Sequence, residues 1–182
     1  MERALNMNTT ASSFLSFSHN KLIDQYWPRL RACVERLNDE QVWWRPNEAS
    51  NSIGNLVLHL NGNVRQWLVA PFADLPDTRN RNAEFAAEGG MTVPQLLELL
   101  AQTIQLAQGT LVRLTEAELT ARYDIQGYNV SGLEAVYQVV EHFGLHYGQI
   151  VYITKWLCGE DLGFYRSLNA TGRATGSETS LA

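Results

Sequence analysis

The sequence GLEAVYQVVEHFGLHYGQIVYITKWL occupies residues 132–157 and is predicted to form one long helix. Ser131 and Glu134 make a capping box at its start, in which each side chain satisfies a free backbone N–H of the first turn. Gly159 lies just beyond the last apolar residues, where a glycine commonly ends a helix. We therefore expect an uninterrupted helix that carries His142 and His146 near its middle.

Three further segments have the apolar period of helices. Pro28 lies inside the first of them and is expected to kink it, because proline removes a backbone donor and crowds the preceding turn. Ser52 can cap the second, which is expected to stop before Pro71. Thr92 opens the third as part of another capping box. Four long helices predict an all-α fold of the four-helix-bundle type; the other three cover residues 13–37, 52–69 and 93–114.

The remaining segments are expected to be connections and termini. No segment has a clear β pattern, although residues 122–130 could form a short extended connector. The long link at 71–91 is of the kind that is often functional in a compact domain. We expect one helical domain at 13–166, a disordered N-terminus at 1–12 and a flexible tail rich in Ser, Thr, Gly and Ala at 167–182.

Composition narrows the classes of protein to which the chain can belong. Its 182 residues are 45% apolar, which suits one domain with a substantial core. A formal net charge of -5 without a basic block argues against nucleic-acid binding. Cys33 and Cys158 make no disulfide framework and suit a reducing cytoplasm. We find no signal peptide and no apolar stretch of membrane-spanning length, so we expect a cytoplasmic protein without a membrane partner.

The histidines suggest a metal site. His142 and His146 are four residues apart, so they share one face of their helix, about 6 Å apart along its axis. Imidazoles at this spacing can reach one ion at metal–nitrogen distances of about 2.0–2.1 Å. His59, in the middle of the second helix, is the candidate for a third ligand. A single buried histidine is commonly an ordinary core residue, but three on two apolar helices need a shared partner for their polar nitrogens.

Glycines inside the same two helices carry a second argument. Gly54, Gly62, Gly144 and Gly148 each cost roughly 1 kcal/mol relative to alanine in a helix interior. Such residues often lie where a neighbouring backbone approaches closely. Tight helix packing alone would account for them. The alternative is that the close approach also lets short imidazole side chains from two helices meet at one ion.

Polar residues near the histidines are candidates for supporting roles. Gln149 lies on the face of His142, and Asn55 and Asn63 flank His59 by one turn on either side. Ligating histidines usually donate their second ring proton to such groups, although each amide can equally be an ordinary polar residue. The link at 71–91 carries charged residues that could form a lid over an anionic substrate, but a solvated, salt-bridged loop is the interpretation we favour; they are Asp77, Arg79, Arg81 and Glu84.

Two segments resemble motifs of a known superfamily. SIGNLVLHLNGNVRQW, residues 52–67, looks like the second-helix motif of the DinB-like (YfiT-like) superfamily of metal-dependent four-helix-bundle proteins. VEHFGLHYGQI, residues 140–150, looks like its last-helix motif, and the resemblance extends over roughly residues 13–158. It implies an up-down bundle, a homodimer, and a divalent metal, most often zinc or nickel, on His59, His142 and His146, with water completing the shell.

The resemblance also implies a class of reaction. Characterised relatives are mostly transferases and isomerases that use a low-molecular-weight thiol as co-substrate. Three neutral imidazoles would leave an open coordination position, which is typical of catalytic sites. The sequence therefore predicts a metal-dependent enzyme, either a thiol-dependent S-transferase or a hydrolase, of unknown substrate and with no assigned catalytic residue. The alternative is a metal-binding or interaction module without turnover.

Overall fold

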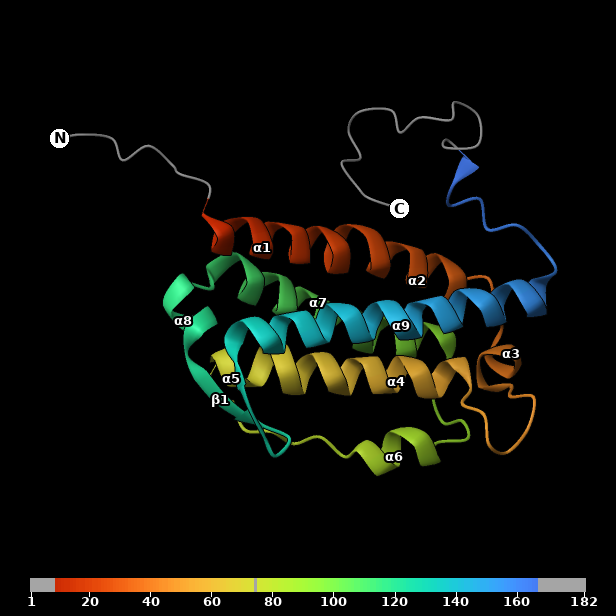
Figure 1. Cartoon of the computed structure of the whole chain (residues 1–182). Coiled ribbons are helices and arrows are strands. Elements are labelled where there is room, and N and C mark those ends of the chain that lie inside the picture. The colour runs from red at the N-terminus through yellow and green to blue at the C-terminus, as the bar shows by residue number, and fades with distance from the viewer. Residues whose placement is uncertain (1–8, 74, 167–182) are drawn as a thin grey trace.

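The computed structural model describes residues 9–73 and 75–166 (Figure 1). Helix α1 begins at Thr10, with Thr9 as its N-cap, so residues 10–12 are helical and the expected disordered N-terminus is too long by these residues. The predicted tail at 167–182 and the first eight residues lie outside the described part of the chain.

Four long helical segments pack side by side and confirm the predicted all-α class (Figure 1). α4 lies against both α7 and α9, and α9 also packs on η1 and α2. One large side chain from each segment is fully buried where they meet; these are Leu22, Leu60, Leu100 and Phe143. The segments are α1 (Thr10–His19), η1 (Asn20–Tyr26) and α2 (Trp27–Val34); α4 (Ile53–Val64), η2 (Arg65–Val69) and α5 (Ala70–Ala73); α7 (Val93–Arg113); and α9 (Gly132–Cys158).

The predicted caps at Ser52, Thr92 and Ser131 are present, and all three are capping boxes, although a box was predicted only for Thr92 and Ser131. Ser52, Thr92 and Ser131 each accept from the backbone N–H three residues on, and the residue there bonds back to the cap. Gly159 ends α9 in the left-handed conformation, with φ of 67°. These local signals therefore act as the sequence suggests.

Two π-helical segments accommodate the internal prolines. η1 ends two residues before Pro28, and η2 ends two residues before Pro71. A widened turn moves carbonyls away from the proline ring, which would otherwise clash with the preceding turn. The expected stop before Pro71 was therefore wrong, because the helix continues through this residue to Ala73.

The connections contain short elements that the apolar period did not indicate. β1 and β2 form an antiparallel hairpin in which Arg122 pairs with Ser131 and Ile125 with Tyr128. Its turn places Gln126 at φ of 54° and Gly127 at 82°. The extended connector expected at 122–130 is thus present, but the sequence did not indicate that its two halves pair as strands. The short elements are α3 (Asp39–Trp43), α6 (Arg81–Ala86), α8 (Glu116–Thr120), β1 (Arg122–Ile125) and β2 (Tyr128–Ser131).

Three of the four helix glycines make room for side chains or face open space, not a neighbouring helix backbone. A Cβ on Gly54 would lie 2.7 Å from the indole of Trp43, and one on Gly144 would lie 3.1 Å from the hydroxyl of Tyr26. A Cβ on Gly148 would meet nothing within 4 Å. The expected approach of helix backbones at these glycines is therefore wrong.

Within the described residues, no helix combines the length and the apolar character needed to cross a membrane.

Candidate metal centre

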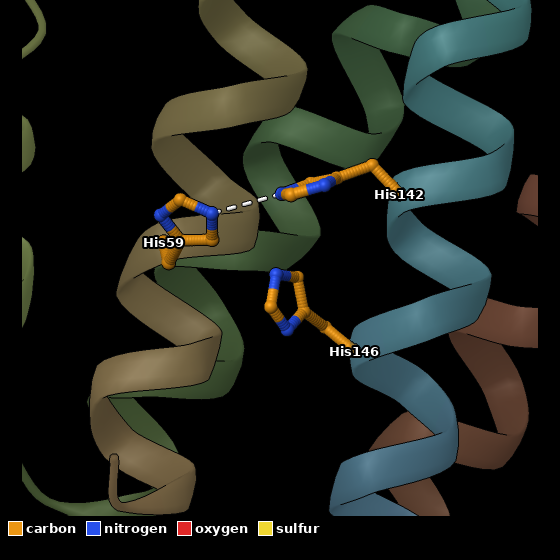
Figure 2. A group of neighbouring side chains, drawn as sticks. All are labelled: His59, His142 and His146. Atoms are coloured by element: carbon orange, nitrogen blue, oxygen red, sulfur yellow. Dashed lines mark hydrogen bonds between the residues drawn. The ribbon is translucent and has the colours of Figure 1, made fainter. Parts of the chain in front are cut away.

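Three histidines from two helices point toward one another (Figure 2). His59 lies on α4, and His142 and His146 lie one turn apart on α9. One ligand atom from each lies within 4.8 Å of the others. Nε2 of His59 is 2.8 Å from Nε2 of His142. The structure therefore brings together the three residues that the sequence singled out, in a group that could hold a metal ion.

The spacing of these nitrogens fits a shared ion. Two ligands at about 2.0–2.1 Å from a tetrahedral ion lie about 3.3 Å from each other. The observed separation of 2.8 Å and the upper bound of 4.8 Å bracket that distance. Small side-chain rotations would therefore place all three imidazoles around one ion.

The opposite ring nitrogens of two of these histidines are held by polar side chains. Nδ1 of His59 lies 3.0 Å from Oε2 of Glu84, and Nδ1 of His146 lies 2.7 Å from Oε1 of Gln149. An acceptor at Nδ1 keeps the proton there and leaves the Nε2 lone pair free for a metal. This is the arrangement of outer partners that ligating histidines usually have.

Glu84 is itself held in a buried network. Its carboxylate accepts from Nε of Arg79 at 2.7 Å and from Nη2 at 2.8 Å, and Gln66 accepts from Nη1 of the same arginine at 2.9 Å. The side chains of Arg79 and Glu84 are only 4% and 10% exposed. Burial alone would raise the pKa of Glu84, but the hydrogen bonds from Arg79 and His59 outweigh it and the pKa is lowered. The carboxylate therefore stays ionised beside His59.

The same arginine also approaches the ring of His59. Nη2 of Arg79 lies 3.0 Å from Nδ1 of His59, as close as the Glu84 carboxylate. Nη2 also donates to Glu84 at 2.8 Å, and the ionised carboxylate of Glu84 can only accept, so its contact with Nδ1 requires a proton on Nδ1. We therefore assign the proton on Nδ1 to the bond with Glu84, which leaves Nε2 as the acceptor.

Gly62 makes the space that this network occupies. A Cβ at this position would overlap Oε1 of Glu84 and lie 2.8 Å from Nε of Arg79. Glycine is therefore required so that the ion pair can lie directly against α4, one turn from His59. We predicted that this glycine lets two helix backbones approach closely. That prediction was wrong, because the group that lies against Gly62 is the side-chain pair of Arg79 and Glu84 from the 71–91 link.

The imidazoles of α9 are kept neutral by their surroundings. Burial, followed by the neighbouring histidines His146 and His59, lowers the pKa of His142 to about 4. Burial also lowers the pKa of His146, against an opposing hydrogen bond to Gln149. Neutral imidazole is the form that binds a metal ion. Both ligand candidates are thus ready for an ion at neutral pH.

Of the three amides predicted to support the site, only Gln149 bonds directly to a histidine among the described residues. Asn55 closes the capping box with Ser52 and donates to the carbonyls of Glu84 at 3.0 Å and of Ala87 at 2.7 Å. It therefore positions α6, which carries Glu84, and does not touch His59. Asn63 is 4% exposed, and its Oδ1 is buried without a hydrogen-bond partner.

The residues that sequence reasoning undervalued lie in the 71–91 link. The favoured interpretation, a solvated loop, was wrong for Arg79 and Glu84, which are buried against His59. Asp77 accepts from Gln66 at 2.6 Å at the edge of the same network. The sequence feature that could have indicated their role is the concentration of charged residues in the long link that follows the helix of His59.

A cavity of about 710 Å³ adjoins the histidine group. His59 and His142 form part of its wall, with Arg79 and Arg81 from the link beside them. The hairpin and α9 complete the cavity with polar and aromatic side chains; among them are Gln126, Tyr128, Tyr137 and Gln138. The site therefore has room for a small organic molecule next to the candidate ligands.

Comparisons with known proteins place this chain in a family. A model of a family described as a protein of unknown function, DUF1572, matches residues 9–170. The crystal structure of a conserved protein from Enterococcus faecalis has the same fold, with a TM-score of 0.58 and 18% identity over 86% of this chain and 100% of that one. No protein with a curated description matches the chain. Because the family model covers most of its length, the chain belongs to the family DUF1572.

Proposed function

We propose that this protein is a metal-dependent enzyme that binds one divalent ion through His59, His142 and His146. The observation that carries the proposal is the convergence of three imidazoles within 4.8 Å, two of them held from behind by Glu84 and Gln149. Neutral imidazole donors favour zinc or nickel over magnesium or calcium, which prefer oxygen ligands. Three protein ligands leave a position for a substrate, as catalytic sites do.

The chemistry proposed is activation of a thiol or of water. A divalent ion on three neutral imidazoles would supply a Lewis acid that makes a thiol or water bound to it more acidic. Either would give a nucleophile, so the reaction is a thiol-dependent S-transfer or a hydrolysis. The chain's own part is to fix the imidazoles: Glu84 holds the Nδ1 proton of His59, Arg79 keeps Glu84 ionised, and Gln149 orients His146.

Three further features of the prediction remain proposals. The two histidine motifs support membership of the DinB-like superfamily. Exposed apolar side chains along α9, such as Tyr152 at 65% and Trp156 at 67% exposure, support a homodimer. Free Cys33 and Cys158 support a reducing, cytoplasmic location, and the negative net charge supports the absence of nucleic acid.

Metal content tests the proposal directly. Protein purified without a histidine tag would be analysed by mass spectrometry for zinc and nickel, beside the variants His59→Ala and His146→Ala. His19→Ala is the matched control, because His19 lies on α1 and bonds Asp24 instead of facing the site. We expect about one ion per chain in the native protein and the control, and loss of the ion in both site variants.

Two outcomes would count against parts of this proposal. Equal, near-zero metal in all four proteins would refute the metal site and leave three packed histidines. Full metal content, with no thiol or water reactivity toward activated acyl or alkyl test substrates, would favour the second candidate, a metal-binding module without turnover.

A further inference from the structure

One cation on the wall of the histidine cavity is not matched by a carboxylate. Arg81 begins α6 and forms no ion pair with any residue in the described part of the chain; its guanidinium lies 4.8 Å from the ring centre of Phe85. That ring in turn lies 4.6 Å from the ring of His59, so the cation is set close to the candidate ligands. Arg79, by contrast, is fully engaged by Glu84 and Gln66.

The carboxylate that lines the same cavity, that of Glu134, does not form an ion pair with Arg81. Glu134 also lines the cavity, but it accepts from the backbone N–H of Ser131 at 2.6 Å and from Ser131 Oγ at 2.8 Å. Its remaining charge is shared with Arg122 at 3.3 Å. The cavity therefore presents Arg81 as a cation without a counter-ion, next to a site that would gain further positive charge with a metal.

A second observation, independent of charge, is the unpaired amide of Asn63. This side chain lines the same cavity one turn from His59, is 4% exposed, and makes no hydrogen bond to any described residue. A buried polar atom without a partner costs free energy, so such groups in native proteins usually serve a ligand or an ordered water. An amide offers both a donor and an acceptor, which matches another amide.

Resting on the proposed function, we infer that the substrate of this site is a small organic anion: Arg81 binds its carboxylate, Asn63 hydrogen-bonds an amide group within it, and its reacting end lies at the three histidines. These two residues therefore determine specificity and not the reaction itself. The inferred class is that of short carboxylic acids with an internal amide, of which an N-acylated amino-acid thiol is the simplest example.

Three thiol probes separate the two contacts. N-acetylcysteine carries thiol, amide and carboxylate; N-acetylcysteamine lacks the carboxylate; 3-mercaptopropionate lacks the amide. Each would be titrated into protein loaded with Co²⁺, and sulfur binding would be followed by the thiolate-to-cobalt charge-transfer absorption. Native protein should bind N-acetylcysteine about tenfold more tightly than either partial probe, as expected for one extra hydrogen bond to a charged or buried group.

Variants assign each preference to its residue. Arg81→Gln should bind N-acetylcysteine and N-acetylcysteamine equally, whereas the matched control Arg31→Gln, on the exposed surface of α2, should keep the preference. Asn63→Leu should abolish the advantage of N-acetylcysteine over 3-mercaptopropionate. Because Oδ1 of Asn63 has no partner, this variant should unfold in urea at the same or a higher midpoint than native protein. A residue with a structural role would lose stability instead.

The outcomes distinguish this inference from the proposed function. Equal affinity of native protein for all three thiols, with cobalt bound, would overturn the inference and leave the metal site intact. A carboxylate preference that survives Arg81→Gln, or an amide preference that survives Asn63→Leu, would overturn the assignment of that residue. Absence of any charge-transfer band would refute thiol chemistry. Calorimetry with N-acetylglycine and N-ethylacetamide on native protein and Arg81→Gln would then decide the anion site alone.

Discussion

Replacing Gly62 by alanine should reverse the usual effect of such a change in a helix. Alanine is preferred to glycine in a helix interior by about 1 kcal/mol. At Gly62, however, the new methyl carbon would overlap Oε1 of Glu84 and lie 2.9 Å from its Cδ and 2.8 Å from Nε of Arg79. Carbon atoms in favourable contact are about 3.5–4.0 Å apart. The carboxylate would therefore have to leave its position against α4.

The expected loss follows from the hydrogen bonds that Glu84 would give up. It accepts from Nε of Arg79 at 2.7 Å and from Nδ1 of His59 at 3.0 Å, and hydrogen bonds to charged groups contribute about 1.5–3 kcal/mol each. Subtracting the gain in helix propensity of about 1 kcal/mol leaves a net destabilisation of about 2–5 kcal/mol. Because His59 would lose its outer partner, metal affinity should also fall by about 10–100-fold.

The assay is urea unfolding of metal-free protein, with metal affinity measured against a chromophoric chelator. Gly109→Ala is the matched control, since Gly109 lies on α7 and a Cβ there would meet nothing within 4 Å. It should gain up to about 1 kcal/mol and keep its metal affinity. If Gly62→Ala were as stable as Gly109→Ala and bound metal normally, the Glu84 network would not support the site.

Three further predictions concern single side chains. Burial and neighbouring histidines lower the pKa of His142 to about 4, so between about pH 6.5 and 4 the unfolded chain takes up a proton that the folded chain does not. The free energy of unfolding of the metal-free protein should therefore fall as the pH decreases through that window. Urea midpoints that do not change with pH would contradict this. Gln149→Leu should weaken metal binding about tenfold, measured by competition with a chelator, because Gln149 bonds His146. The unfolding midpoint should not change, because Gln149 is exposed. Unchanged metal affinity would exclude a role of Gln149 in the site. Burial raises the pKa of Cys33 to about 11, so iodoacetamide should label partly exposed Cys158 first, as followed by peptide mass spectrometry; equal rates would show that Cys33 is accessible.

The parts of the fold that the sequence predicted correctly are those that depend on side chains only a few positions apart. The capping boxes at Ser52, Thr92 and Ser131 depend on side chains three positions apart, so the helix starts were correct. The pairing of His142 with His146 follows in the same way from the helical repeat. His59 needed a tertiary contact, and it could be anticipated because three buried imidazoles on two apolar helices require a shared partner.

The parts that failed depend on backbone geometry or contacts that no local pattern contains. Pro71 indicated a helix stop, yet the π-helical turn before it lets the helix continue. The hairpin turn at Gln126 and Gly127 uses two positive φ angles, and glutamine is not a residue that signals such a turn. Glu84 lies 25 residues from His59 in the sequence, so the bond between them is visible only once the link has folded onto α4.

That contact explains why the link at 71–91 belongs to the site. Asn55, at the start of α4, holds the carbonyls at the end of α6, and Gly62, two turns later, receives the carboxylate of Glu84. α4 thus fixes α6 at both ends of the stretch that contains His59. With α6 fixed, Arg79 can keep Glu84 ionised, while Arg81 lies on Phe85 at the cavity wall and has no ion-pair partner among the described residues. Two arginines two residues apart therefore differ in their contacts: Arg79 holds Glu84 against His59, and Arg81 is the residue that we propose binds the substrate.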